Sequence, residues 1–112
     1  MTFRDDRQLA RACRALLAHV GLAHLWTSLG PTHEAATLLW ANGASLAPRD
    51  RAIFLAAWAF WNGSGGITLA ELLDRLDVVS AEALCFLVMA SKYDADAVDD
   101  WLVVHGRPVV AA

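Results

Sequence analysis

The clearest indication of the fold is the stretch PRDRAIFLAAWAFWNG, residues 48–63. Ten consecutive apolar residues, Ala52–Trp61, form its middle. Pro48 suits the first turn of a helix, where its missing amide proton is not needed, and Gly63 is typical of a helix end. A helix that is apolar on all sides is buried among other elements. The stretch therefore predicts a central helix with neighbours on both sides.

Bulky and small side chains occupy opposite sides of this predicted helix. At about 100° per residue, Phe54, Trp58 and Trp61 fall on one side, and alanines at positions 52, 56 and 59 fall on the other. Tryptophan fills protein cores and is also enriched at protein interfaces. The aromatic side therefore leaves three interpretations open, which are core packing, a partner interface and a ligand pocket. On the second interpretation, Trp58 and Trp61 are candidate partner contacts.

The region after the central helix, residues 67–91, follows a helix-turn-helix pattern. Thr68 and Glu71 form a capping box that predicts the start of a fourth helix. Ser80 is expected to cap a fifth helix after a short turn. This arrangement occurs in many regulators that bind DNA, and it also occurs as a plain packing hairpin.

The charges of this region argue against DNA binding through its second helix. A helix that reads DNA presents basic and amide side chains, yet between positions 81 and 91 the only polar residues are Glu82 and Ser91. Residues 68–104 hold eight acidic and two basic groups, which is a local charge of −6. Such a surface gains nothing from the release of counterions around DNA. We therefore interpret the region as a packing hairpin.

An arginine stripe marks the predicted first helix, which starts near residue 3 with a Thr2–Asp5 capping box. Four guanidinium groups on one helical face can bind phosphates, acidic lipids or an acidic protein surface. The alternative is the solvated face of an amphipathic helix. The stripe consists of Arg4, Arg7, Arg11 and Arg14.

Acidic side chains gather near the start of a predicted sixth helix, which begins at Asp94 or Asp96. They are best interpreted as N-terminal charges that stabilise the helix through its dipole, rather than as calcium ligands. Residues 1–30 carry a charge of +2, whereas residues 68–104 carry −6. Opposite patches favour either intramolecular packing or head-to-tail association of copies. The candidate partner contacts in this region are Asp96, Asp99 and Asp100.

Local signals place the remaining boundaries. The apolar pattern shifts at Gly21, which predicts a bend or break after the first helix. Thr32 is expected to cap a short second helix that stops at Asn42-Gly43. Gly106 and Pro108 are expected to end the sixth helix. No alternating pattern is long enough to indicate a sheet.

The composition predicts one folded domain, residues 1–112, with an excess of apolar residues. Of these residues 57% are hydrophobic and 19% charged, the mean hydropathy is +0.40 and the formal net charge is −3. The apolar content excludes a disordered chain, and an excess in a short chain tends to be covered by a partner or another copy. The longest apolar run is too short for a membrane span, and the charged N-terminus does not resemble a signal peptide. We expect a cytoplasmic protein.

Catalytic and metal-binding patterns are not found in the sequence. Cys13 and Cys85 lie far apart in apolar segments, so we expect free, buried thiols. The four histidines lack the spacing of metal ligands. Ser64 lies in GSGG but lacks the surroundings of a nucleophile elbow. We expect no enzymatic activity, no metal and no cofactor.

Together these patterns predict an all-α protein, a compact bundle of five to six helices with a helix-turn-helix-like hairpin near residues 68–91. The function that we expect is non-catalytic protein–protein interaction or self-assembly. One alternative is a helix-turn-helix regulator that contacts DNA through the arginine stripe. A further alternative is a small binder of apolar ligands that uses the aromatic cluster as its pocket. A membrane is not an expected partner.

Overall fold

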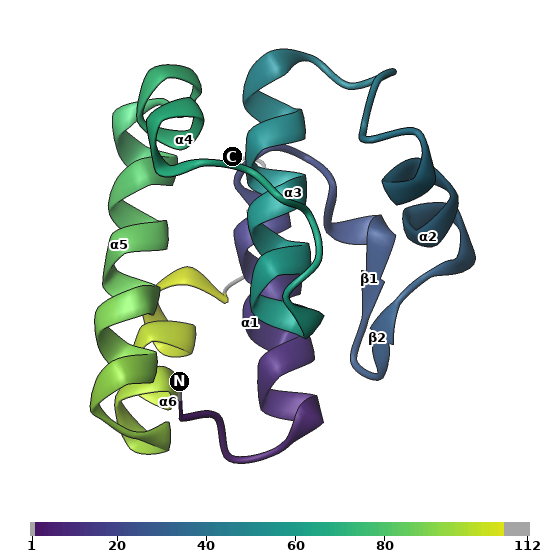
Figure 1. The fold of residues 1–112 in the computed structure, drawn as a ribbon. Helices are drawn as coiled ribbons and strands as arrows, with labels where there is room; N and C mark the ends of the chain where they lie inside the picture. The colour runs from purple at the N-terminus through teal and green to yellow at the C-terminus, as the bar shows by residue number, and fades with distance from the viewer. Residues whose placement is uncertain (1, 107–112) are drawn as a thin grey trace, which may run out of the picture.

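Helix α3 (Pro48–Asn62) occupies the centre of the molecule, as its sequence predicts (Figure 1). The computed structural model describes residues 2–106. Pro48 lies in the first turn of α3, and Gly63 ends the helix with a left-handed φ of 78°. Every residue from Ala52 to Trp58 is buried, whereas Ala59 is exposed. The helix therefore keeps a narrow solvent-facing side near its C-terminal end, which the apolar run did not predict.

Helix α1 (Asp6–Ala18) packs against α3 and starts later than predicted. The extended Asp5 is its N-cap, and the Asp5 carboxylate accepts a hydrogen bond from the Gln8 amide at 2.8 Å. The side-chain oxygen of Gln8 in turn accepts a hydrogen bond from the Arg4 amide at 2.6 Å. The predicted capping box of Thr2 with Asp5 is therefore wrong, because Gln8 completes a cap that begins three residues further along the chain.

A small hairpin follows α1, and the predicted break after the first helix is confirmed. A 3-10 turn, η1 (Ala23–Leu25), leads into strand β1 (Trp26–Thr27), which pairs antiparallel with strand β2 (Gly30–Pro31). Each strand has two residues, so no alternation in the sequence could indicate it. Gly30 has a φ of 132°, and a Cβ atom there would lie 2.7 Å from the Trp61 ring. The close approach therefore requires glycine.

Threonine side chains start two short helices as predicted. The Thr32 hydroxyl accepts a backbone amide at 3.1 Å at the start of helix α2 (His33–Trp40). The Thr68 hydroxyl does the same at 3.1 Å for helix α4 (Leu69–Arg75). Both caps satisfy an amide that has no partner inside the helix. The two predicted helix starts are confirmed.

Helix α5 (Val78–Tyr93) begins earlier than predicted. Its N-cap is Asp77, which has an extended backbone conformation, and Ser80 lies inside the first turn. The prediction that Ser80 caps the helix is therefore wrong. Ser80 is buried at 2% exposure, whereas Val78 and Val79 of the same turn are exposed.

Helix α6 (Ala95–His105) has its N-cap at Asp94, the first of the two predicted positions, because the Asp94 carboxylate accepts the Ala97 amide at 2.8 Å. The apolar residues of α6 at positions 98, 101 and 102 are buried. Gly106 is its C-cap, and Pro108 lies outside the described residues. The sixth helix is therefore confirmed over its described length.

The helices are arranged around α1 and α3, which lie in the middle (Figure 1). Helices α4, α5 and α6 lie on one side of this pair, and the β1–β2 hairpin and α2 lie on the other. Buried apolar residues from both sides join one core cluster. Residues 2–106 contain six α-helices and one two-stranded sheet, so the predicted all-α bundle is confirmed.

Candidate functional site

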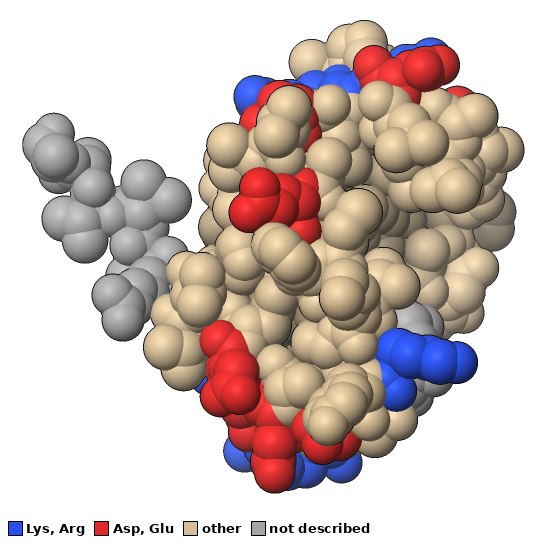
Figure 2. Space-filling view, turned by 90° about the vertical axis from the view of Figure 1, so that its left-hand side faces the viewer, with Lys and Arg blue, Asp and Glu red and all other residues tan. Residues whose placement is uncertain are grey.

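Helices α4 and α5 carry most of the exposed apolar side chains of the described residues. Eight of the twelve exposed large hydrophobic side chains belong to these two helices. Figure 2 shows that uncharged residues cover most of this side of the molecule. Large exposed apolar patches are uncommon on monomeric proteins, so this side of the molecule is a candidate interaction surface. We call it the α4–α5 apolar face, formed by Leu69, Leu73, Val78, Val79, Phe86, Val88, Met89 and Tyr93.

The hairpin of α4 and α5 packs against the bundle on one side only. The inner side of α5 buries Ala83, Leu84 and Leu87 against α1 and α6. Helix α4 contacts α3 but has no buried residue. The hairpin geometry predicted near residues 68–91 is confirmed, and the expected packing role holds for half of α5. The other half faces solvent.

Five positions on the outer side of α5 form a seam whose spacing alternates between three and four residues. This spacing keeps side chains on one side of a helix, and it is the repeat through which coiled-coil helices pair. The apolar members are exposed by between 48% for Phe86 and 81% for Tyr93. Glu82 is the charged member. We call this set the α5 seam, and it consists of Val79, Glu82, Phe86, Met89 and Tyr93.

The two cysteines differ in their surroundings. Cys13 is buried, its thiol donates to the Ala57 carbonyl oxygen at 3.4 Å, and burial raises its pKa to about 12. Cys85 is exposed and lies next to Phe86 of the α5 seam. The prediction of a buried thiol is confirmed for Cys13 and wrong for Cys85. The apolar residues next to Cys85 in the sequence do not reveal that its own side chain faces solvent.

The tryptophans divide between core and surface. Trp58 is 5% exposed, and its ring lies edge-on to Trp26 with the ring centroids 5.1 Å apart. Trp61 is partly buried and also packs edge-on to Trp26, at 5.9 Å. Of the interpretations that the sequence left open, core packing therefore holds for Trp58. Trp40 on α2 is 93% exposed, and no sequence signal distinguished it from the buried tryptophans.

The arginine stripe does not form one helical face, because Arg4 precedes α1. The Arg4 guanidinium forms ion pairs with Asp96 at 2.8 Å and with Asp99 at 2.5 Å. Hydrogen bonds from Arg4 and then from Gln8 lower the pKa of Asp99. Asp100 is exposed. For Arg4, Asp96 and Asp99, the structure therefore shows intramolecular pairing of the opposite charges noted in the sequence.

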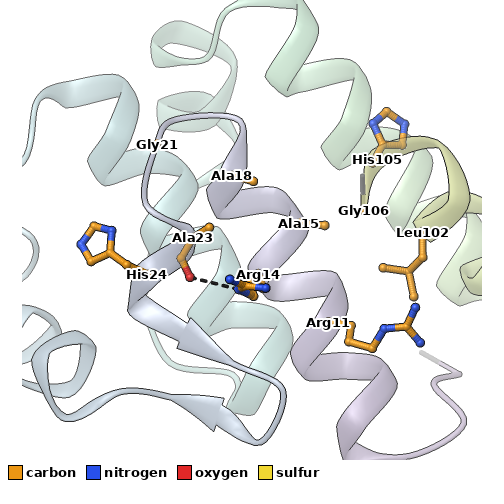
Figure 3. Close-up of a pocket in the computed structure, with 10 residues that line it drawn as sticks. All are labelled: Arg11, Arg14, Ala15, Ala18, Gly21, Ala23, His24, Leu102, His105 and Gly106. Carbon is orange, nitrogen blue, oxygen red and sulfur yellow. Dashed lines mark hydrogen bonds between the residues drawn. The ribbon is translucent and has the colours of Figure 1, made fainter. Parts of the chain in front are cut away.

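The other three arginines of the stripe are exposed on α1. Two of them, Arg11 and Arg14, line a cavity of about 470 Å³, whereas Arg7 does not. Figure 3 shows that both project from α1 and that His24 and His105 lie on either side of them. The cavity thus brings together basic side chains from α1, η1 and the end of α6.

His105 lies at the border between this cavity and the core. Its ring stacks on Trp101 with the centroids 4.8 Å apart and lies 5.5 Å from the ring of His19. Burial lowers the pKa of His105, and the nearby His19 lowers it further, while Glu82 acts in the opposite direction. His19 and His105 are 86 positions apart, so nothing in the sequence indicates this approach.

Several kinds of site are not found among residues 2–106. In this part of the chain, no three His, Cys, Asp or Glu side chains lie close enough together to hold a metal ion. Nor does any described helix combine the length and apolarity needed to cross a membrane. Comparisons with protein-family models, with curated proteins and with solved structures found no match. The α4–α5 apolar face and the cavity are therefore the features from which a function can be inferred.

Proposed function

We propose that this protein acts through non-catalytic association, and that it binds a second copy of itself through the α5 seam. The observation that carries the proposal is the seam itself. Its alternating spacing is the pairing repeat of coiled coils, yet it faces solvent while the opposite side of α5 is already packed. A second helix with the same repeat would cover these side chains.

The charges along α5 favour an antiparallel pair. In a parallel pair, Glu82 would lie opposite Glu82 of the second copy, and two carboxylates there repel each other. In an antiparallel pair centred on Phe86, Glu82 lies opposite Met89 and close to Lys92 of the second copy. Opposite charges then meet at both ends of the seam. Such a pair is isologous, as a closed dimer requires.

The size of the surface sets the expected affinity. A stable interface buries about 800 Å² on each partner. Helix α5 has 16 residues and is narrower than such an area requires, so Leu69 and Leu73 of the neighbouring α4 must join the contact. Because the contact is apolar with few charges, we expect a dimer that forms at micromolar concentrations and depends little on salt.

Sedimentation velocity and light scattering test the dimer. The wild type should change from a mass of 12.1 kDa toward twice that value as its concentration rises through the micromolar range. Phe86→Glu should remain monomeric at every concentration, because it places a charge at the centre of the seam. Phe86 is about half exposed in the monomer, so the melting temperature of the dilute variant should stay near that of the wild type.

Leu29→Glu is the matched control. It makes the same change from apolar to acidic at a side chain that is 73% exposed but lies outside the α4–α5 apolar face. This variant should dimerise like the wild type. A wild type that is monomeric throughout, or a Phe86→Glu variant that still dimerises, would show that a second copy does not occupy the seam. Equal losses in both variants would point to net charge rather than to the seam.

A further inference from the structure

The cavity beside α1 has a different character from the α4–α5 apolar face. It has a volume of about 470 Å³, which lies within the range of about 300–1,000 Å³ typical of small-molecule sites. Ala15 and Ala18 of α1, together with Gly21 and Ala23, leave it open because their side chains are small. Leu102 of α6 adds an apolar wall. The space is therefore partly apolar and large enough for a small organic molecule.

The charge of the cavity comes from Arg11 and Arg14. None of the described residues that line it is acidic. Within residues 2–106 the arginines in ion pairs are Arg4, Arg49 and Arg51, so neither cavity arginine is paired with a described carboxylate. The Nε atom of Arg14 donates to the Ala23 carbonyl oxygen at 3.4 Å, which holds this side chain over the opening (Figure 3). Its terminal nitrogen atoms make no hydrogen bond to a described residue.

We propose that this cavity binds a small organic anion, in which a phosphate or carboxylate group is joined to a compact apolar body. The planar guanidinium group matches the oxygen atoms of both anions and can donate two parallel hydrogen bonds to either. Arg11 and Arg14 lie one turn apart on α1, and both line the cavity, Arg14 on the side of Ala23 and Arg11 on the side of Leu102 (Figure 3). The apolar body then contacts Ala15, Ala18 and Leu102.

His24 and His105 stand at the rim, on either side of the two arginines (Figure 3). A neutral imidazole retains one N–H donor, so these side chains can add a hydrogen bond without a second charge. Trp101 stacks against His105 and thereby limits the movement of its ring. This inference does not depend on the proposed dimer, whose contacts lie on α4 and α5.

Titration calorimetry with phenyl phosphate, benzoate and phenol tests the site. Phenyl phosphate and benzoate share an apolar ring with phenol but carry an anionic group, so both should bind and phenol should not. In backbone NMR spectra, the amides of Ala15, Ala18 and Leu102 should shift during the titration. Arg11→Gln and Arg14→Gln should each weaken binding by about tenfold, which is the usual effect of losing one charged hydrogen bond.

Arg7→Gln is the matched control, because Arg7 belongs to the same stripe on α1 but does not line the cavity. It should bind phenyl phosphate within about twofold of the wild type, the change expected from a distant surface charge. Equal losses in all three arginine variants would show a general attraction to positive charge and would overturn the proposal. So would binding of phenol as strong as that of phenyl phosphate, or no binding at millimolar concentrations. Binding to vesicles of an anionic phospholipid without binding to phenyl phosphate would assign the arginines to a membrane surface instead.

Discussion

Helices α3 and α5 both contain long apolar runs, yet the run in α3 is largely buried and the run in α5 is partly exposed to solvent. The run of ten residues in α3, Ala52–Trp61, is largely buried, and the residues from Ala52 to Trp58 are buried without exception. The run of eight in α5, Ala83–Ala90, alternates between buried positions and exposed ones such as Phe86 and Met89. An apolar run therefore predicts that a helix requires neighbours, but it does not show where those neighbours come from.

The position of each helix explains the difference. Helix α3 contacts α1 and α4 and is also reached by Trp26 of the β1–β2 hairpin. Helix α5 contacts α1 and α6 through its inner side. It lies at the edge of the bundle, and no described element covers its outer side (Figures 1 and 2). The apolar residues of α3 and of the inner side of α5 therefore stabilise the fold, whereas the outer side of α5 is the surface on which the proposed dimer depends.

Exchange of Trp58 for alanine should have the largest effect on stability. A small effect would mean that α3 is not more deeply buried than α5. Trp58 is 5% exposed, so Trp58→Ala should lower the free energy of unfolding by about 3–5 kcal/mol. That loss is a large part of the stability of an ordinary domain. Phe86→Ala on α5 should cost the monomer about 0.5 kcal/mol or less. Urea denaturation of both variants at low concentration measures the difference, and equal costs would mean that the two helices are equally buried.

Larger side chains at two alanines of α3 compare a buried position with an exposed position of the same helix. Ala56 is 3% exposed, so Ala56→Leu should destabilise the fold by about 1–3 kcal/mol through overpacking. Ala59 is exposed, and Ala59→Leu should change the stability by about 0.5 kcal/mol or less. Thermal unfolding of the two variants gives both values. If Ala59→Leu were the more damaging exchange, the orientation of α3 would be wrong.

The smallest effect concerns pH and the side of the molecule that contains α5 and α6. Because the pKa of His105 is lowered in the folded state, the unfolded chain binds protons more readily near the ordinary pKa of histidine. The contribution of His105 to the free energy of unfolding is therefore fully present above about pH 6.5 and decreases as the pH falls below that value. The buried run of α3 contains no titratable group, so it contributes nothing to this change. Around His105 lie His19 and Glu82, whose charges act on its pKa, and Arg11, Arg14 and His24, which line the same cavity.

His105→Gln isolates this contribution, because glutamine keeps a polar side chain that does not titrate in this range. The melting temperature of the wild type should fall more between about pH 7.5 and about pH 5.5 than that of the variant. Trp101 donates its indole hydrogen bond to the Ala83 carbonyl oxygen at 2.9 Å. This bond does not involve His105, so we expect it to hold α5 and α6 together in the variant as well. Identical falls in the two proteins would assign the pH dependence to other groups.

The sequence predicted best those features that depend on neighbouring residues. The caps at Thr32, Thr68 and Asp94 follow from side chains that reach amides three residues away, and all three are found. The cap of α1 was misplaced because Thr2 and Asp5 form an equally plausible local pair. Ser80 was misjudged as a cap for the same reason. Local patterns identify helices reliably, but they do not choose between two adjacent caps.

The candidate sites were predicted less completely, because each depends on residues that are distant in the sequence. The pattern showed that Arg11 and Arg14 share a helical face, but their cavity also requires Leu102 and His105 of α6. The exposed position of Cys85 follows from the absence of a neighbour beyond α5 among the described residues. No periodicity within one helix carries this information.

That this chain forms a bundle of helices can be predicted from its sequence, because apolar periodicity and caps act within a few residues. Which surfaces remain exposed to solvent depends on the tertiary structure. Gln8 shows the reason, because its side chain donates to the Ala95 carbonyl oxygen at 2.8 Å and to Asp99 at 2.9 Å, across 87 and 91 positions of the chain. Such contacts join α1 to α6, and α5 packs against both helices through its inner side only. They arise only when the folded chain brings distant residues together.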